Sequence, residues 1–163
     1  TLGDARLALE VFRGNVALDE AAFRSVRQAM EAPSARIGLG LALRGLATSA
    51  IDVSDGLMGD LGHILERSGV GAVIEIDTLP RSPVLAAQPI EVQRECLLTG
   101  GDDYELLFTA MPERRDAVAA AAGNAAVAIT RIGQIEGGRG LRVVDRQGNA
   151  VTSGGRPFDH FRS

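Results

Sequence analysis

The chain has 163 residues, of which 45% are apolar and 23% charged, as expected for one globular domain with its own core. Its net charge of −4 argues against a nucleic-acid surface, which needs a clustered basic face. No apolar run reaches the roughly 18 residues of a membrane span, and the single cysteine, Cys96, excludes an internal disulfide and a thiolate metal cluster, so we expect a cytoplasmic protein.

The basic residues of the chain are all Arg, and Lys does not occur. The Lys of a phosphate-binding P-loop, a Schiff-base Lys and the catalytic Lys of kinase active sites are therefore excluded within this chain. The first residue is Thr1 and not Met, so we expect the natural start of the protein to lie upstream.

Apolar residues recur at helical spacing through the first 45 positions. We expect one helix to end at Gly14, and a second helix, capped by Asp19, to end at Pro33. A short apolar run over residues 47–53 then predicts a buried strand. Beyond it, the pattern predicts helices over residues 57–68, 90–98 and 112–122, and strands over residues 72–77, 104–109, 127–135 and 141–144.

A glycine-rich segment, residues 137–140, separates the last two predicted strands. We expect it to be a hairpin turn, because it lacks the spacing and the Lys of a P-loop. Helices and strands are mixed along the chain without strict alternation. We therefore predict an α+β fold, with a mixed β-sheet covered by helices, in a single domain over residues 1–163.

The strongest local signal is Asp52-Val-Ser54-Asp55-Gly-Leu, where a predicted strand meets a predicted helix. Such a junction is expected to offer free backbone N–H groups and the positive end of a helix dipole, both suited to phosphate oxygens. Asp52 and Asp55 are hard oxygen ligands of the kind that Mg²⁺ prefers, and Ser54 could donate a hydrogen bond to a ligand oxygen. The alternative is structural: Asp55 or Ser54 caps the helix, and Asp52 lies in a turn.

The second signal is a run of acids that follows a Gly-Gly pair and precedes an apolar strand. Such close carboxylates repel one another unless cations or solvent screen them. In an extended chain, Asp102 and Tyr104 share one face, and Asp103 and Glu105 share the other, so one pair at most can look into a given site. A Gly-Gly turn with solvated acids is the alternative. In the tail, Phe158 and Phe161 either dock the C-terminus or line a pocket.

Several of these segments, taken in order, resemble those of thiamine-monophosphate kinases. The resemblance is carried by Ala-Ile-Asp52-Val-Ser54-Asp55-Gly-Leu with Asp60-Leu-Gly-His63, by Thr99-Gly-Gly-Asp102-Asp-Tyr-Glu-Leu-Leu-Phe, and by the closing Phe158-Asp-His-Phe161. Related PurM-like enzymes, such as aminoimidazole ribonucleotide synthetase and selenophosphate synthetase, share the architecture without this combination of motifs.

The resemblance implies a PurM-like C-terminal domain and the ATP-dependent phosphorylation of thiamine monophosphate to thiamine diphosphate, by direct transfer. Carried over by motif, Asp52 and Asp55 would bind Mg²⁺, Ser54 would contact ATP, and Asp102 and Phe158 would contact thiamine monophosphate. The family's N-terminal ATP-binding domain is absent from this chain, so we expect the chain alone to be inactive. The full-length protein is expected to be a homodimer, with neither nucleic acid nor a membrane as a partner.

One departure from the family concerns residues 33–37, Pro-Ser-Ala-Arg-Ile, which stand where the family more often shows Pro-Arg. This difference allows that loop to pack differently. Two other functional interpretations stay open. The chain could belong to another PurM-like ATP-dependent enzyme with a different phosphate acceptor, or it could be a non-catalytic domain that binds a phosphorylated ligand or a partner.

Overall fold

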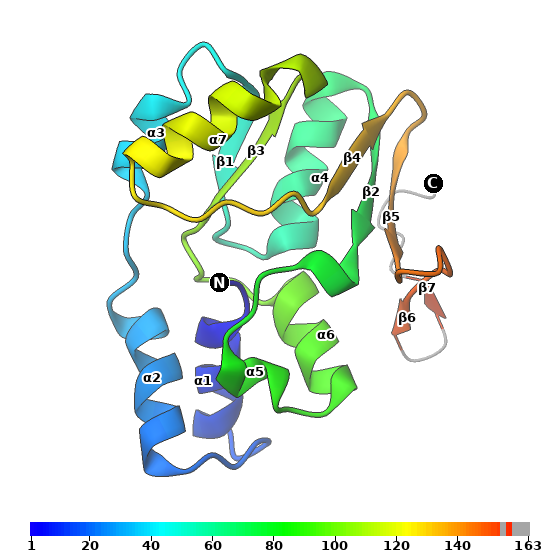
Figure 1. Cartoon of the computed structure of the whole chain (residues 1–163). Coiled ribbons are helices and arrows are strands. Elements are labelled where there is room, and N and C mark those ends of the chain that lie inside the picture. The colour runs from blue at the N-terminus through cyan, green and yellow to red at the C-terminus, as the bar shows by residue number, and fades with distance from the viewer. Residues whose placement is uncertain (154–155, 158–163) are drawn as a thin grey trace.

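The computed structural model describes residues 1–153 and 156–157 and contains both helices and strands (Figure 1). The α-helices are α1 (Asp4–Phe12), α2 (Glu20–Glu31), α3 (Ile37–Ala42), α4 (Leu57–Ser68), α5 (Pro83–Ala86), α6 (Ile90–Thr99) and α7 (Arg115–Asn124), and the 3₁₀ turns are η1 (Ile76–Thr78) and η2 (Pro112–Arg114). The strands are β1 (Ala47–Asp52), β2 (Gly71–Glu75), β3 (Leu106–Ala110), β4 (Gly133–Glu136), β5 (Gly140–Val144), β6 (Thr152–Ser153) and β7 (Arg156–Pro157). The α+β class predicted from the sequence is confirmed.

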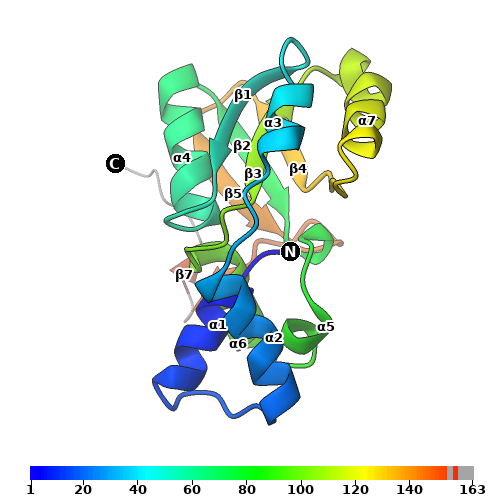
Figure 2. The ribbon, with the colours of Figure 1, turned by 90° about the vertical axis from the view of Figure 1, so that its left-hand side faces the viewer.

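The molecule has a helical end and a sheet end (Figure 1). Helices α1, α2, α5 and α6 gather at the helical end, whereas strands β1 to β5 lie at the other end with α3, α4 and α7. When the molecule is turned by 90°, α4 and α3 are seen on opposite sides of β1 (Figure 2). The strand that leads into the strongest sequence motif thus lies between two helices, although alternate residues along it stay exposed.

The first two helices follow the sequence signals closely. The Asp19 carboxylate accepts a hydrogen bond from the backbone N–H of Ala22 at 2.8 Å, as an N-cap does, and α2 ends just before Pro33. Helix α4 ends at Gly69, whose φ of 66° lies in the left-handed region that favours glycine. The predicted cap and end of α2 and the predicted end of α4 are therefore confirmed.

Strands β1 and β3 pair in antiparallel fashion and form a sheet of their own. Their register places Asp52, the last residue of β1, opposite Leu106, the first residue of β3. We predicted β3 from residue 104, but it begins at Leu106, because Asp102 and Tyr104 have positive φ angles of 64° and 48° that a strand does not accommodate. The single mixed sheet expected from the sequence is thus divided, with this pair separate from the rest.

The second sheet has the order β4-β2-β5, in which β2 pairs with β4 antiparallel and with β5 parallel. Strands β4 and β5 lie on opposite edges of β2, so the predicted hairpin between them is wrong. The glycine-rich segment instead crosses the start of β2. A Cβ atom at Gly71 would collide with the carbonyl oxygens of Gly138 and Gly140. The crossing is possible because β2 begins with a glycine.

The strand predicted over residues 127–135 is much shorter in the structure, where β4 starts at Gly133. The apolar residues before it have other packing partners. Val127 and Ile129 pack against α3 and α7, and Ile132 packs against the larger core. The apolar residues that predicted a strand thus belong to an irregular segment that packs first on the smaller cluster and then on the larger one.

Two hydrophobic clusters hold the molecule together. The larger cluster joins the helical end to α4 and the three-stranded sheet and includes Leu7, Leu57, Leu97 and Leu141 among its most buried members. The smaller cluster packs α3 and α7 against the outer face of the β1–β3 pair. Within the described residues, no helix has both the length and the apolar character needed to cross a membrane.

Candidate functional site

Two loops meet where β1 ends and β3 begins. We call residues 52–56, which start with the last residue of β1, the first loop, and residues 101–105 the second loop. The N–H of Asp102 donates to the Ser54 carbonyl at 2.9 Å, and the N–H of Tyr104 donates to the Val53 carbonyl at 2.8 Å. These bonds extend the pairing of β1 with β3 beyond the strands. The two signals that the sequence showed separately therefore lie side by side.

The first loop is closed by a carboxylate of its own chain. The Oδ2 atom of Asp60, in the first turn of α4, accepts from the backbone N–H groups of Ser54, Asp55 and Gly56 at 2.9, 3.1 and 3.2 Å. Asp60 is only 2% exposed. Asp60 therefore occupies the N–H groups of Ser54, Asp55 and Gly56, so these three are not free for phosphate oxygens. The expectation of free N–H groups within the first turn of α4, residues 57–59, stays a prediction.

The structural alternative for this motif is also wrong. The N-cap position of α4 is held by Gly56, with φ 113° and no side-chain capping bond, so neither Ser54 nor Asp55 caps the helix. A Cβ atom at Gly56 would lie 3.0 Å from the backbone of Thr99 at the end of α6. A glycine at this position lets the first loop pack directly on α6.

The side chains of Asp52 and Asp55 are exposed, and Ser54 is half-buried. None of the ion pairs found in residues 1–153 and 156–157 uses either carboxylate. Asp60 binds the backbone N–H groups of Ser54, Asp55 and Gly56. The first loop therefore presents side chains, and not these N–H groups, to a ligand. These two carboxylates are therefore available to a ligand or cation.

The side chains of the second loop alternate in exposure, as predicted, but Tyr104 and Glu105, one from each predicted pair, line the same hollow, so the expectation that only one pair can face a site is wrong. Asp102 and Tyr104 are exposed, and Asp103 and Glu105 are half-buried. The backbone that achieves this alternation is not extended, because Asp102 and Tyr104 both have positive φ. Such angles cost about 1–3 kcal/mol for each residue unless the surroundings hold them.

The inward side chains of the second loop provide that support. Both oxygens of the Asp103 carboxylate accept from the N–H of Gly3, at 3.0 and 2.8 Å. The guanidinium of Arg36 donates to both oxygens of Glu105 at 2.8 and 2.7 Å, a bidentate pair that fixes orientation. The loop is thus tied to the N-terminal segment on one side and to the start of α3 on the other.

The pKa values of the second loop reflect this arrangement. Burial raises the pKa of Asp103 to about 7, against the opposing effect of the Gly3 N–H. The negative charge of Asp102 raises the pKa of Tyr104, whose hydroxyl donates to the Asp102 carboxylate at 3.3 Å. The charges of Asp52 and Asp55 raise it further. Three exposed carboxylates from the two loops therefore lie within electrostatic reach of one hydroxyl.

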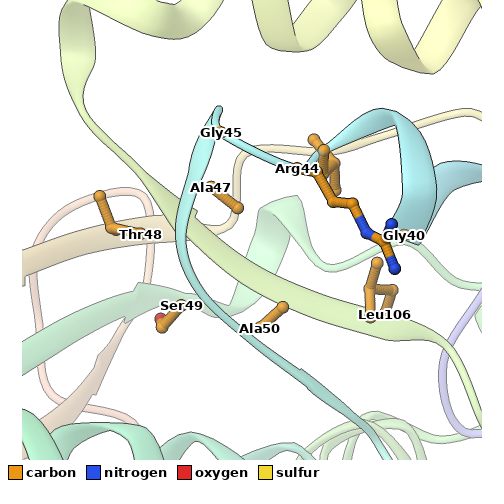
Figure 3. Close-up of a pocket in the computed structure, with 9 residues that line it drawn as sticks. Gly40, Arg44, Gly45, Ala47, Thr48, Ser49, Ala50 and Leu106 are labelled. Carbon is orange, nitrogen blue, oxygen red and sulfur yellow. The ribbon is translucent and has the colours of Figure 1, made fainter.

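A hollow of about 290 Å³ adjoins the two loops and is lined by Ala35, Arg36, Ile37, Gly40, Asp52, Tyr104, Glu105 and Leu106. A neighbouring hollow of about 240 Å³ shares Gly40 and Leu106 with it and lies over β1. In Figure 3 the Arg44 side chain reaches from the end of α3 towards Gly40, above Leu106. The hollow of about 290 Å³ is the better candidate for ligand binding, because the Asp52 carboxylate of the first loop lines it.

The two loops offer few side chains that could bind a metal ion. In the described part of the chain, no group of three or more His, Cys, Asp or Glu residues is arranged to hold one. Mg²⁺ commonly takes one or two protein carboxylates and completes its shell with phosphate oxygens and water. Asp52 and Asp55 fit that requirement as a partial set. Phe158, the remaining predicted site residue, lies outside the described residues.

Sequence reasoning missed the side chains that hold these loops. Asp60 could have been recognised, because an acid in the first turn of a helix is the residue expected to face N–H groups at its start. The contacts of Asp103 with Gly3 and of Glu105 with Arg36 join residues 100 and 69 positions apart. No local pattern could have revealed them. Cys96 is a buried core thiol, and burial raises its pKa to about 12.

Comparison with known proteins gives a consistent family. The C-terminal domain of AIR synthase related proteins matches residues 13–146 of the chain. The thiamine-monophosphate kinase of Salmonella typhimurium is 39% identical over 164 residues, which cover 99% of this chain and 50% of that protein.

Solved structures agree. The crystal structure of thiamine-monophosphate kinase from Stenotrophomonas maltophilia K279a has a TM-score of 0.82 and 43% identity, covering 93% of this chain and 49% of that chain. The structure of AaThiL complexed with AMPPCP and TMP has a TM-score of 0.72 and 33% identity, covering 99% of this chain and 49% of that chain. The chain thus spans about half the length of the relatives that it matches.

Proposed function

We propose a function from one premise: the chain belongs to the family of AIR synthase related proteins, as their C-terminal domain. It would be the C-terminal half of a thiamine-monophosphate kinase, which transfers the γ-phosphoryl group of ATP to thiamine monophosphate and yields ADP and thiamine diphosphate. Residues 1–163 would form one domain, completed by an N-terminal ATP-binding half, and the full-length protein would be a cytoplasmic homodimer. The relatives at 39% and 43% identity support this proposal.

The observation that carries the proposal is that backbone hydrogen bonds hold the loop with Asp52 and Asp55 beside the loop with Asp102, and Asp102 accepts from the Tyr104 hydroxyl. Phosphoryl transfer needs positioning and charge neutralisation more than covalent catalysis, so exposed carboxylates beside a hollow are suitable when cations accompany the phosphates. The complex of AaThiL with AMPPCP and TMP, at 33% identity, supports binding of a nucleotide and an acceptor phosphate by this fold.

Each residue would have a separate role. Asp52 and Asp55 would hold Mg²⁺ that arrives with the nucleotide, and Ser54 would donate a hydrogen bond to ATP. Asp102 would contact thiamine monophosphate, whose thiazolium cation favours a carboxylate, and Phe158 would contact the same substrate. Bound magnesium would neutralise phosphate charge. The part of the chain that the structure describes supplies no third ligand group for a metal, which is why we expect the chain alone to be inactive.

The test is coupled ADP production by the full-length protein, supplied with Mg-ATP and thiamine monophosphate. We expect turnover that falls about 100-fold or more in Asp52→Asn and in Asp55→Asn, since each removes a cation ligand. Glu66→Gln is the matched control, because Glu66 is an exposed acid on α4 outside the two loops. This chain alone should show no turnover above background.

The outcomes separate the alternatives. Preference for another phosphate acceptor would replace the proposal with a different ATP-dependent enzyme of this fold. Ligand binding without turnover on any acceptor would favour a non-catalytic domain. Turnover by the isolated chain would contradict the expected need for the second half.

A further inference from the structure

We infer that Asp60 is a positioning residue: its buried carboxylate takes the place of a bound anion at the start of α4 and sets the first loop so that Asp55 stands outward beside Asp52. The inference rests on the proposed function for the cation that those two residues would hold. It assigns phosphate binding at this corner to side chains and cations and excludes the N–H groups of Ser54, Asp55 and Gly56.

The geometry of Asp60 supports this role. A single oxygen, Oδ2, lies 2.9–3.2 Å from three consecutive backbone nitrogens, those of Ser54, Asp55 and Gly56. Converging N–H groups at a helix start are the usual receptor for a phosphate or sulfate. Here the receptor is filled from within, by a side chain that is almost fully buried.

This arrangement has two consequences for ligands. A phosphate cannot bind the N–H groups of Ser54, Asp55 and Gly56 without displacing a buried carboxylate, and it would then meet like charge. The exposed carboxylates of the first loop also repel a bare phosphate. A nucleotide would therefore be held here only together with divalent cations, and the cation affinity would depend on how firmly Asp60 fixes Asp55.

The role can be separated from an ordinary capping contribution to stability. Asp19 accepts a hydrogen bond from the N–H of Ala22 at the start of α2, far along the chain from either loop. Asp19→Asn is therefore a matched control, since it weakens a helix cap without touching the first loop. Asp60→Asn keeps the shape of the side chain and removes its charge, and Asp60→Glu keeps the charge and moves it by one methylene.

The experiment uses the full-length protein and two readouts, neither of which is activity. Hydrogen exchange of peptides covering residues 53–57 is followed by mass spectrometry, with peptides from α6 as the reference for global opening. Asp60→Asn should speed exchange in residues 53–57 about tenfold, because charge-assisted bonds are lost. Asp19→Asn should leave that region unchanged.

The second readout is Mn²⁺ binding in the presence of AMPPCP, measured from the EPR signal of free Mn²⁺. We expect the half-saturating Mn²⁺ concentration to rise about tenfold in Asp60→Asn, to recover in part in Asp60→Glu, and to stay unchanged in Asp19→Asn. AMPPCP without a divalent cation should not protect residues 53–57 from exchange.

Each other outcome overturns the inference. Unchanged exchange in Asp60→Asn would mean that Asp60 does not hold the loop. Faster exchange with unchanged Mn²⁺ binding would leave Asp60 a purely structural residue. Protection by AMPPCP alone would mean that the helix start does receive phosphate. If the wild-type protein binds no Mn²⁺ and has no kinase activity, the proposed function itself fails, and the first readout still reports whether Asp60 holds the loop.

Discussion

The first loop and the second loop both present exposed carboxylates, and each is held by a carboxylate turned inward. In the first loop the inward group is Asp60, which binds N–H groups four to six residues earlier in the chain. In the second loop it is Asp103, which binds the N–H of Gly3, 100 residues away. The first arrangement is local, and the second exists only in the folded chain.

This difference affects how each loop responds to its surroundings. Asp60 receives three N–H groups at a helix start, where the dipole also favours a negative charge. Asp103 receives one N–H, has the acidic Asp4 and Glu105 nearby, and has its pKa raised to about 7 by burial. We therefore expect the second loop to depend on pH and on the N-terminal segment, whereas the first loop depends on contacts within a few residues.

The largest expected effect comes from removing the local support. Asp60→Ala leaves three backbone N–H groups without their acceptor, so we expect the free energy of unfolding of this chain to fall by about 4 kcal/mol. Urea denaturation followed by circular dichroism measures it. A loss below about 1 kcal/mol would mean that solvent replaces Asp60 easily, and the contrast between the loops would disappear.

The second largest effect is expected from disrupting the close packing of the second loop on the first loop. A Cβ atom at Gly101 would collide with the Ser54 carbonyl oxygen, so Gly101→Ala should lower the free energy of unfolding by about 3 kcal/mol. Gly59→Ala is the control, because a Cβ atom there meets nothing within 4 Å. It lies within α4 and should stabilise the chain by about 0.5–1 kcal/mol. Equal changes in the free energy of unfolding for the two variants would contradict the close packing of Gly101 on Ser54.

The pH dependence of the second loop follows from Asp103. The folded state holds its proton up to about pH 7, whereas an unfolded Asp releases it near pH 4, so this group makes the free energy of unfolding fall as pH rises between those values. Asp103→Asn removes that titration. Between pH 5 and pH 8 the variant should lose about 2 kcal/mol less than the parent chain.

Chemical denaturation of both proteins at the two pH values provides the comparison. The other acids titrate alike in both proteins, so they cancel in the difference. Parallel pH profiles for the parent and the variant would show that Asp103 is not the titrating group.

The smallest expected effect concerns the outer support of the second loop. The Arg36–Glu105 ion pair is bidentate, with side chains 31% and 23% exposed. Arg36→Met should cost about 1 kcal/mol, and less at high salt, because solvent screens a partly exposed pair. The control is Arg24→Met, whose pair with Glu20 has side chains 77% and 87% exposed, and which should change little. A larger loss of stability in Arg24→Met than in Arg36→Met would contradict the expected importance of the less exposed pair.

Local chemistry made much of the fold predictable. Asp19 before α2 and Gly69 after α4 each fix a short segment through contacts within a few residues, and both are confirmed. The apolar run at β1 predicted the strand correctly and its burial wrongly, because alternate residues of β1 are exposed. The same reasoning failed where partners are distant. The hairpin expected near Gly137 is wrong, because β2 lies between β4 and β5, and nothing in residues 133–144 shows which strand will separate them.

By itself the sequence determined which side chains could carry the chemistry and how the second loop alternates, since both depend on residue type and on neighbouring positions. The tertiary structure decided which groups remain available. Asp60 occupies three backbone N–H groups just before α4, and Gly3 and Arg36 hold the strained second loop from positions far away along the chain. A hydrogen-bond donor or acceptor is available only when no folded partner has taken it, and that is settled by packing in three dimensions.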